Sequence, residues 1–372
     1  MPSATPGKVT VVIVDDSSSV RAVLRRLLAR APGIQVIGEA ADGETAVDLV
    51  ERLRPDVLLL DIVMPQLDGF GVLARLGRGR PVPAILLTSR ADRAEVRAAF
   101  QALGSGAVEL LPKPDDPESW RLLAETLPAV VRAASAAKLP AVPAAPEQRL
   151  PHLPPSHPLP PLDPLAAPGP SSPAAPRPRS GREVSWLAIG ASTGGPAAVR
   201  DLLANLPAPA PFPILIVQHI ASGFETGLAE WLASTLGLDV RIALAGELPG
   251  PGAVRIAPGG VHLRLGPDGR LELDDVTPPR RGHRPSADEL FHSLARGAAS
   301  RGVAVLLTGM GTDGANGLRE LRTAGALCFA QDEASSAVFG MPRAAIELGA
   351  AELVAAPSAI GGEIARRLRE TR

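Results

Sequence analysis

The chain of 372 residues has one cysteine, no tyrosine and no long apolar run. The single cysteine, Cys328, excludes a disulfide within the chain and fits a reducing compartment. It lies in the apolar run ALCFA, so we expect it in a core. Aromatic residues make up only 3% of the chain, so the cores must be mainly aliphatic. No stretch of about 18 apolar residues is free of charge and proline, and we expect no transmembrane helix.

Two further absences narrow the class of protein. The N-terminus, MPSATPGKVTVV, lacks the basic region, apolar stretch and cleavage site of a secretory signal, so we expect a cytoplasmic protein without membrane insertion. The chain also lacks an excess of basic residues, with 38 Lys and Arg against 39 Asp and Glu. A nucleic-acid-binding protein needs a basic surface, so we expect no nucleic acid as a partner.

Proline, in contrast, is abundant in one segment. Residues 140–178 contain 15 prolines among 39 residues. Because proline fixes φ and cannot donate a backbone hydrogen bond, this segment can form neither a helix nor an inner strand. We expect a disordered, semi-extended linker over residues 134–181, with its two histidines solvated rather than bound to a metal. The linker would separate two domains, residues 6–133 and residues 182–372.

Both domains alternate short aliphatic runs with amphipathic stretches, which is the pattern of parallel α/β folds. In the first domain, helical patterns such as SSVRAVLRRLLAR lie between the aliphatic runs, which cover residues 9–14, 34–40, 56–60, 84–88 and 107–111. Five strands and five helices predict a doubly wound sheet. The ligands of such sheets gather at the carboxyl ends of the strands.

Polar residues end or follow four of these runs, at the edge where ligands gather. Asp15 and Asp16 follow the first run, Asp61 the third, and Thr88 and Lys113 stand at the ends of the last two. Three carboxylates at one edge repel each other unless a cation lies among them, and oxygen ligands suit Mg²⁺. A hydroxyl and an ammonium could then bind the oxygens of a phosphoryl group, since an aspartate can be the nucleophile in phosphoryl transfer.

This set of residues resembles the receiver domain of two-component response regulators over the whole length of the domain. The resemblance implies that Asp61 is the phosphoacceptor. It also implies that Asp16, Asp61 and the backbone carbonyl of Val63 hold Mg²⁺, with Asp15 completing the acidic pocket.

The same resemblance implies that Thr88 is the switch hydroxyl and Lys113 the phosphate-binding cation. One position departs from the family pattern. Receivers usually carry Tyr or Phe three residues before the lysine, and this chain has Leu110 there. The aromatic rotamer switch that usually responds to phosphorylation in this family is therefore in question. Phosphorylation itself is still expected.

In the second domain, apolar runs over residues 184–190, 212–220 and 303–309 predict buried strands, and VHLRLGPDGRLELDD predicts a β-hairpin. Ser192, His219 and Asp313 stand at the carboxyl ends of the three strands, where an open α/β sheet places its site. Acyl transfer requires these residue types. The imidazole takes the proton of the serine hydroxyl, and the carboxylate fixes the imidazole tautomer and stabilises the imidazolium.

The stretch around the serine, GASTGG, is open to several interpretations. It matches the G-x-S-x-G elbow of the α/β-hydrolases, but it also fits a tight turn or a phosphate cradle. The order Ser192, His219, Asp313 excludes the α/β-hydrolases, in which the acid precedes the histidine. A dinucleotide-binding loop would need an acidic residue at the end of the next strand, which ends in Gln218 and His219. A non-catalytic signalling scaffold is the other alternative, against which the intact trio argues.

Six stretches of this domain resemble the chemotaxis protein-glutamate methylesterase (CheB) family. In chain order over residues 184–345 they are IGASTGGP, IVQHI, IAPGGVHL, HRPSADELFHSLA, LLTGMGTDGANGL and AQDEASSAVFGMPRAA. Receiver, linker and this domain are the architecture of that family. We therefore expect an α/β protein of two doubly wound parallel-sheet domains, a flavodoxin-like receiver and a Rossmann-like methylesterase domain with a β-hairpin.

The resemblance also implies the roles of the site residues. Ser192 is the nucleophile, His219 the general base and Asp313 the acid that orients the base. The backbone N–H groups of Thr193 and Met310 would hold the oxyanion, the first of them at a helix start, where free donors favour negative charge.

The activity and partners follow from the same resemblance. A phosphorylation-activated enzyme would hydrolyse glutamate methyl esters, and deamidate glutamines, on the cytoplasmic helices of methyl-accepting chemoreceptors. A histidine kinase of the chemotaxis type would be the phosphodonor. We expect a monomer and no metal in the ester chemistry. His283 and Arg284 would contact the acidic substrate, while His262 is expected at the surface and His292 packed on its helix.

Overall fold

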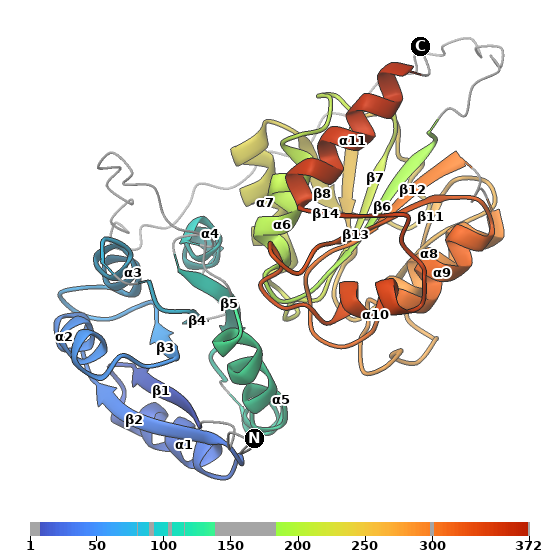
Figure 1. The fold of residues 1–372 in the computed structure, drawn as a ribbon. Helices are drawn as coiled ribbons and strands as arrows, with labels where there is room; N and C mark the ends of the chain where they lie inside the picture. The colour runs from blue at the N-terminus through green and yellow to red at the C-terminus, as the bar shows by residue number, and fades with distance from the viewer. Residues whose placement is uncertain are drawn as a thin grey trace, which may run out of the picture.

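The computed structural model describes residues 8–79, 81–88, 93–102, 106–114, 116–137, 184–297 and 301–370 (Figure 1). The linker predicted over residues 134–181 lies outside the described residues, apart from residues 134–137. None of the helices in the described ranges is long and apolar enough to cross a membrane.

The first sheet has five parallel strands in the order β2-β1-β3-β4-β5. This is the flavodoxin-like order, as predicted. The strands are β1 (Val9–Val14), β2 (Ile34–Ala40), β3 (Val57–Asp61), β4 (Ala84–Thr88) and β5 (Ala107–Pro112). Each coincides with a predicted aliphatic run to within a residue at either end.

Helices cover both faces of this sheet because successive side chains of a buried strand point to opposite faces. Val11 and Ile13 of β1 pack toward α1 and α5, whereas Val12 and Val14 pack toward α2, α3 and α4. The helices are α1 (Ser18–Ala29), α2 (Gly43–Leu53), α3 (Gly69–Gly77), α4 (Arg93–Ala102) and α5 (Pro117–Ser135).

The second sheet has seven strands in the order β14-β13-β12-β6-β7-β9-β8, and all its pairings are parallel. The strands are β6 (Trp186–Ala191), β7 (Ile214–Gln218), β8 (Asp239–Ile242), β9 (Ala253–Ile256), β12 (Gly302–Leu306), β13 (Leu327–Gln331) and β14 (Leu353–Ala355). The strand order reverses at β6, which lies between β12 and β7. Ligands of open α/β sheets bind at such a reversal.

Helices also cover both faces of the second sheet (Figure 1). Those that pack on one face are α6 (Gly195–Leu203), α7 (Glu225–Leu236) and α11 (Pro357–Glu370). Those on the other face are α8 (Ala287–Gly297), α9 (Ala315–Thr323) and α10 (Met341–Glu347). The predicted fold class, two doubly wound parallel-sheet domains, is therefore confirmed.

The predicted hairpin is present as β10 (His262–Leu265) and β11 (Leu271–Asp274), which pair antiparallel. The prediction that His262 lies at the surface is wrong, because its side chain is fully buried. The reason is that both ring nitrogens have backbone partners. Nδ1 accepts a hydrogen bond from the Ser286 amide at 3.2 Å, and Nε2 donates to the Pro278 carbonyl at 3.2 Å.

The two sheets are linked by a helix contact. Helix α4 packs against α7, and the rings of Phe100 and Trp231 are stacked with their centroids 6.0 Å apart. A Cβ on Gly227 of α7 would lie 2.6 Å from Cγ1 of Val96 on α4. The close approach of the two helices therefore requires glycine at position 227.

Candidate active site

Ser192 follows β6 directly and is held by its backbone. Its amide donates to the carbonyl of Thr308 at 3.0 Å. Its carbonyl accepts from the Gly195 amide at 2.7 Å and from Nε2 of Gln218 at 2.8 Å. Gly194 has φ of 76°, and a Cβ on Gly195 would lie 2.1 Å from Oε1 of Gln218, so these two glycines allow the tight strand-to-helix turn.

His219 follows β7, the strand next to β6. Its amide donates to the carbonyl of Ala191, so its Cα lies beside the start of the serine loop. Its ring Nε2 donates to Oδ2 of Asp313 at 2.9 Å. The other ring nitrogen, Nδ1, is buried and has no hydrogen-bond partner among the described residues. One nitrogen is therefore bound to the acid and the other is free to take a proton.

Asp313 lies in the loop between β12 and α9 and accepts four hydrogen bonds. Oδ2 accepts from His219 and, at 2.7 Å, from the amide of Ala287; Oδ1 accepts from the Ser286 hydroxyl at 2.7 Å and the Asp288 amide at 3.3 Å. Burial alone would raise the pKa of Asp313, but the bonds from His219, Ser286 and Ala287 outweigh it and lower the pKa to about 2. The carboxylate is therefore ionised at neutral pH.

The predicted oxyanion donors lie on the two loops that meet at the serine. Thr193 follows the serine, and Met310 follows Gly309, whose Cβ would lie 2.6 Å from Cβ of Ser192. In the described part of the chain, neither the amide of Thr193 nor that of Met310 has a hydrogen-bond acceptor. Both donors are thus available beside the serine.

Two site residues were missed by the sequence analysis. Ser286 holds Oδ1 of Asp313, and its position just before a helix is a recognisable capping pattern. Thr308 has a hydroxyl that donates to the carbonyl of Thr193 at 3.0 Å and accepts from the Val338 amide at 2.9 Å. Nothing in the sequence marks Thr308, because its partners come from other loops.

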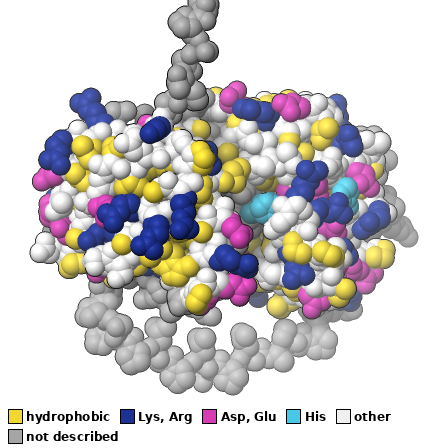
Figure 2. All heavy atoms as spheres, turned by 90° about the horizontal axis from the view of Figure 1, so that it is seen from below, with side chains coloured by type: hydrophobic (Ala, Val, Ile, Leu, Met, Phe, Trp, Pro, Cys, Tyr) yellow, Lys and Arg dark blue, Asp and Glu magenta, His cyan; other side chains and the backbone are white. Residues whose placement is uncertain are grey.

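The two predicted substrate contacts have different surroundings. The ring of His283 lies against the ring of His219, with centroids 3.9 Å apart. The guanidinium of Arg284 instead donates to the carbonyls of Asp275 and Thr277 within its own loop. The ring Nδ1 of His292, a residue predicted to pack, lies in close contact with the Glu320 carboxylate of α9. Figure 2 shows histidine side chains at the surface beside the seam between the two halves and among Lys and Arg side chains.

The predicted acidic pocket is present in the first sheet. One oxygen from each of Asp15, Asp16 and Asp61 lies within 4.8 Å of the others. Nζ of Lys113 lies 3.0 Å from Asp15 and 2.5 Å from Asp61. The Val63 amide donates to Asp61 at 3.2 Å, which places that backbone at the pocket. One ammonium facing three carboxylates leaves excess negative charge, so the pocket could bind a divalent cation.

The charge state of Asp61 follows from its surroundings. Burial raises its pKa, Lys113 lowers it and Asp15 raises it again, and the result is a pKa of about 6. Thr88 is fully buried at the end of β4, and its carbonyl accepts from the Lys113 amide at 2.7 Å. The residues expected to bind and sense a phosphoryl group therefore lie together at one edge.

A side chain of the first sheet reaches the serine loop. Glu109 of β5 lies beside Thr193, the residue after the predicted nucleophile, close enough for the Thr193 side chain to affect its pKa. Burial raises the pKa of Glu109, while Thr193 and the Leu110 amide, which donates to its Oε1 at 3.1 Å, act in the opposite direction. The first sheet thus places a carboxyl group beside one of the two predicted oxyanion donors.

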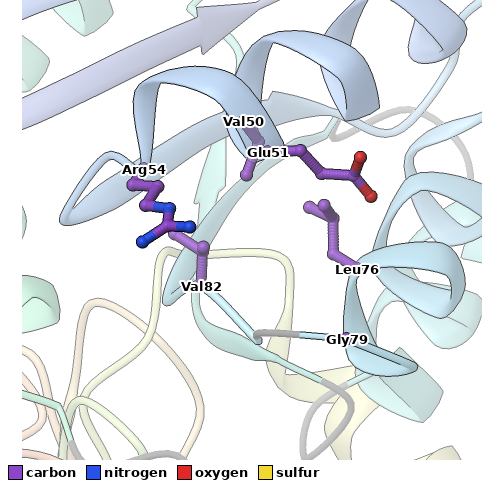
Figure 3. Close-up of a pocket in the computed structure, with 6 residues that line it drawn as sticks. All are labelled: Val50, Glu51, Arg54, Leu76, Gly79 and Val82. Carbon is purple, nitrogen blue, oxygen red and sulfur yellow. The ribbon is translucent and has the colours of Figure 1, made fainter.

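A hollow of about 330 Å³ lies elsewhere in the first domain, between the C-terminal ends of α2 and α3 (Figure 3). It is lined by Val50, Glu51, Arg54, Leu76, Gly79 and Val82. Val82 precedes β4, so the hollow lies at the amino edge of the sheet, opposite the acidic pocket. It belongs to neither site.

Comparisons with known proteins agree with this architecture. Residues 187–364 match the CheB methylesterase family, and residues 11–124 match the response regulator receiver domain. A protein-glutamate methylesterase/protein-glutamine glutaminase of Geobacter metallireducens is 41% identical over 95% of this chain and 96% of its own. One from Xanthomonas campestris is 42% identical over 93% of each chain.

A solved structure is also similar to part of the chain. The CheB methylesterase catalytic domain of Thermotoga maritima is 38% identical and covers 50% of this chain and 98% of its own, with a TM-score of 0.47. The full-length similarity to the curated relatives extends over both sheets and both sites. The chain therefore belongs to the family of protein-glutamate methylesterases/protein-glutamine glutaminases, with a response regulator receiver domain ahead of its CheB methylesterase domain.

Proposed function

We propose that the protein is a phosphorylation-activated hydrolase that removes methyl groups from glutamate methyl esters, and amide groups from specific glutamines, on the cytoplasmic helices of methyl-accepting chemoreceptors. The observation that carries the proposal is the His219–Asp313 pair beside Ser192, at the carboxyl ends of β6, β7 and β12. The family membership of the chain supports the choice of substrate.

The first half of the reaction is acylation. Nδ1 of His219 takes the hydroxyl proton as Oγ of Ser192 attacks the side-chain carbonyl carbon of the substrate. The carbonyl oxygen becomes an oxyanion, which the amides of Thr193 and Met310 stabilise. The imidazolium returns the proton to the leaving group. Methanol departs from an ester or ammonia from an amide, and an acyl-serine remains.

Water completes the reaction by the same route. His219 deprotonates the water, the water oxygen attacks the acyl carbon, and the proton returns to Oγ of Ser192. The product is a glutamate carboxylate. Asp313 stays ionised throughout, because its low pKa keeps it from accepting the proton, and it stabilises the imidazolium.

The receiver would control this reaction. We propose that a chemotaxis-type histidine kinase is the phosphodonor and that Asp61 is the phosphoacceptor. Asp15, Asp16, Asp61 and the Val63 carbonyl would hold Mg²⁺, which would neutralise charge on the transferred phosphoryl group. Lys113 and Thr88 would contact the phosphoryl oxygens. Because Glu109 contacts Thr193, the unphosphorylated receiver would obstruct the oxyanion side of the site.

We propose the same boundaries that the sequence predicts: a receiver over residues 6–133, a linker over residues 134–181 and a catalytic domain over residues 182–372. The same proposal makes the protein a cytoplasmic monomer. Arg284 is not needed as a substrate contact in this proposal, since its guanidinium is bound to carbonyls of its own loop.

The test is Ser192→Ala, assayed for methanol release from methylated receptor fragments. We expect release to fall to the background rate, because the acyl intermediate cannot form. The matched control is Ser234→Ala on α7, a serine whose hydroxyl bonds only to its own helix at the Trp231 carbonyl. Methanol release that survives in Ser192→Ala would overturn the nucleophile assignment.

A further inference from the structure

The ring of His283 is stacked face to face on the ring of His219. The centroids are 3.9 Å apart and the ring planes differ by 3°. The two histidines come from different parts of the chain. His219 follows β7, whereas His283 belongs to the loop between β11 and α8. A loop that brings a flat ring onto the candidate general base calls for an explanation beyond core packing.

The backbone that carries His283 is a tight turn. Arg280 and His283 exchange both backbone hydrogen bonds, at 2.9 and 3.0 Å. The two residues between them, Arg281 and Gly282, have φ of 51° and 85°, the pattern of a type I′ turn. Such a turn constrains the position of the side chain that follows it.

The arginines of this loop tie it to the surrounding structure. Arg280 donates to Glu289 of α8 at 2.7 Å, and Arg284 donates to the Asp275 carbonyl at 2.8 Å. Arg281 donates to the Thr312 hydroxyl at 2.6 Å, directly beside Asp313. The loop is therefore anchored at α8 and at the loop of Asp313, and the Arg284 bond closes it on itself.

The ring of His219 needs a second restraint besides Asp313. A single hydrogen bond at Nε2 leaves the ring able to tilt about that bond, and Nδ1 has no partner among the described residues. A flat neighbour parallel to the ring limits the tilt. It also excludes water from one face of the imidazole that must carry the proton.

The charge of His283 suits this arrangement. Burial, and then the neighbouring His219, lower the pKa of His283 to about 4, with Asp313 acting in the opposite direction. The arginines of the same loop, Arg280, Arg281 and Arg284, direct their guanidinium groups to Glu289, the Thr312 hydroxyl and the Asp275 carbonyl. His283 is therefore neutral at neutral pH, and a neutral aromatic face can stabilise an adjacent imidazolium, whereas a charged one would oppose it.

We propose that His283 is a positioning residue that holds the plane of the His219 ring. The stacked ring would keep Nδ1 in the orientation that the proposed proton transfer from Ser192 requires. Because it is neutral, it would also stabilise the imidazolium formed during the reaction. The inference rests on the proposed roles of Ser192 and His219. It replaces direct contact with the substrate as the role of His283.

The test separates positioning from substrate contact by using a reagent that carries no receptor segment. The full-length protein, activated with acetyl phosphate and Mg²⁺, is treated with phenylmethylsulfonyl fluoride, and the rate of Ser192 sulfonylation is followed by mass spectrometry. Sulfonylation forms the Oγ–S bond, releases fluoride and transfers the hydroxyl proton to His219, so its rate depends on the same base.

We expect His283→Ala to slow the labelling of Ser192 about tenfold or more, since a misplaced base loses rate steeply. His283→Phe keeps a flat neutral ring and should recover the rate to within about threefold of the unmodified protein. For ester hydrolysis, His283→Ala should lower kcat without raising KM.

Two results would overturn the inference. One is an unchanged rate of Ser192 labelling in His283→Ala. If KM for the receptor rises in that variant while labelling is unchanged, His283 contacts the substrate instead. The other is a Phe variant as slow as the Ala variant while both keep the thermal midpoint of the unmodified protein. Failure of the proposed function is recognisable separately, because Ser192 of the unmodified protein would then not be labelled.

Discussion

At the scale of single residues, the surroundings of each carboxyl group decide what it can do. Asp313 accepts hydrogen bonds from His219, Ser286 and the start of α8, so it stays ionised although it is buried. Asp61 is equally buried, but it has another carboxylate and a single ammonium beside it, and its pKa rises to about 6. The surroundings of Asp313 suit a carboxylate that stabilises a protonated His219. The surroundings of Asp61 favour the binding of a metal cation.

The Asp61→Asn variant should be more stable than the unmodified protein at alkaline pH. In the unmodified protein, the pKa of Asp61 in the folded state is about 6, above the ordinary value of 3.8. The folded state therefore holds the Asp61 proton more tightly than the unfolded chain does. The stability that this group contributes is therefore full below about pH 4 and is lost as the pH rises through about 6.

In EDTA, we expect the variant to gain about 1 to 2 kcal/mol at pH 8 and much less at pH 5, measured from denaturant midpoints of the receiver transition. Asp48→Asn, on the exposed side of α2, is the matched control. A lower midpoint for Asp61→Asn at pH 8 would contradict the expectation.

At the scale of elements, β5 connects the two sites. Lys113, which contacts Asp15 and Asp61, follows the end of this strand, and Glu109, which contacts Thr193, lies within it. We therefore expect a change in the partners of Lys113 to act on the strand that carries Glu109, the carboxyl group proposed to obstruct the site. The family's switch aromatic is replaced here by Leu110, which is buried beside Glu109.

The Glu109→Ala variant should raise the basal rate of methanol release several-fold without a phosphodonor, since the oxyanion side of the site loses its carboxyl neighbour. It should also respond less to acetyl phosphate, because part of the activation is already present. The rates with and without acetyl phosphate and Mg²⁺ are the measurement.

Two variants act as controls for Glu109→Ala. Glu125→Ala on the exposed face of α5 should leave both rates unchanged. Asp61→Asn should keep the basal rate and lose the stimulation. Glu109→Ala with an unchanged basal rate would show that this contact does not restrain the enzyme.

At the scale of the whole molecule, a packed interface joins the two domains. The stacked pair Phe100–Trp231 and the close approach at Gly227 place α4 against α7, and Glu109 of the same domain lies beside Thr193. A proline-rich tether mainly sets the effective concentration of one domain at the other. We therefore expect the proposed restraint on the enzyme to depend on the interface more than on the tether.

Replacing residues 140–178 by a Gly-Ser segment of equal length should change the basal rate less than about threefold. Gly227→Leu in the unmodified chain should raise the basal rate several-fold, because the new side chain meets Val96 and Phe100. Methanol release is measured for both. A large increase in the linker-replaced protein alone would show that the tether, rather than the interface, restrains the enzyme.

The sequence by itself determined most of the strands and the residue types that lie at both candidate sites. Continuous aliphatic runs identify the strands of the first sheet and three strands of the second, because strands buried on both faces have no polar alternation. The strands β8, β9, β13 and β14 were not predicted. They are three to five residues long, and polar residues such as Arg241 and Arg255 interrupt two of them.

Only the tertiary structure decided which residues from distant loops meet. Ser286, in the loop before α8, makes two such contacts. Its amide donates to Nδ1 of the buried His262, and its hydroxyl donates to Oδ1 of Asp313. The stacking of His283 on His219, and the contact of Glu109 with Thr193, depend on how the β11–α8 loop and the receiver pack. Sequence patterns report local periodicity and residue type, whereas these contacts depend on the relative placement of elements far apart in the chain.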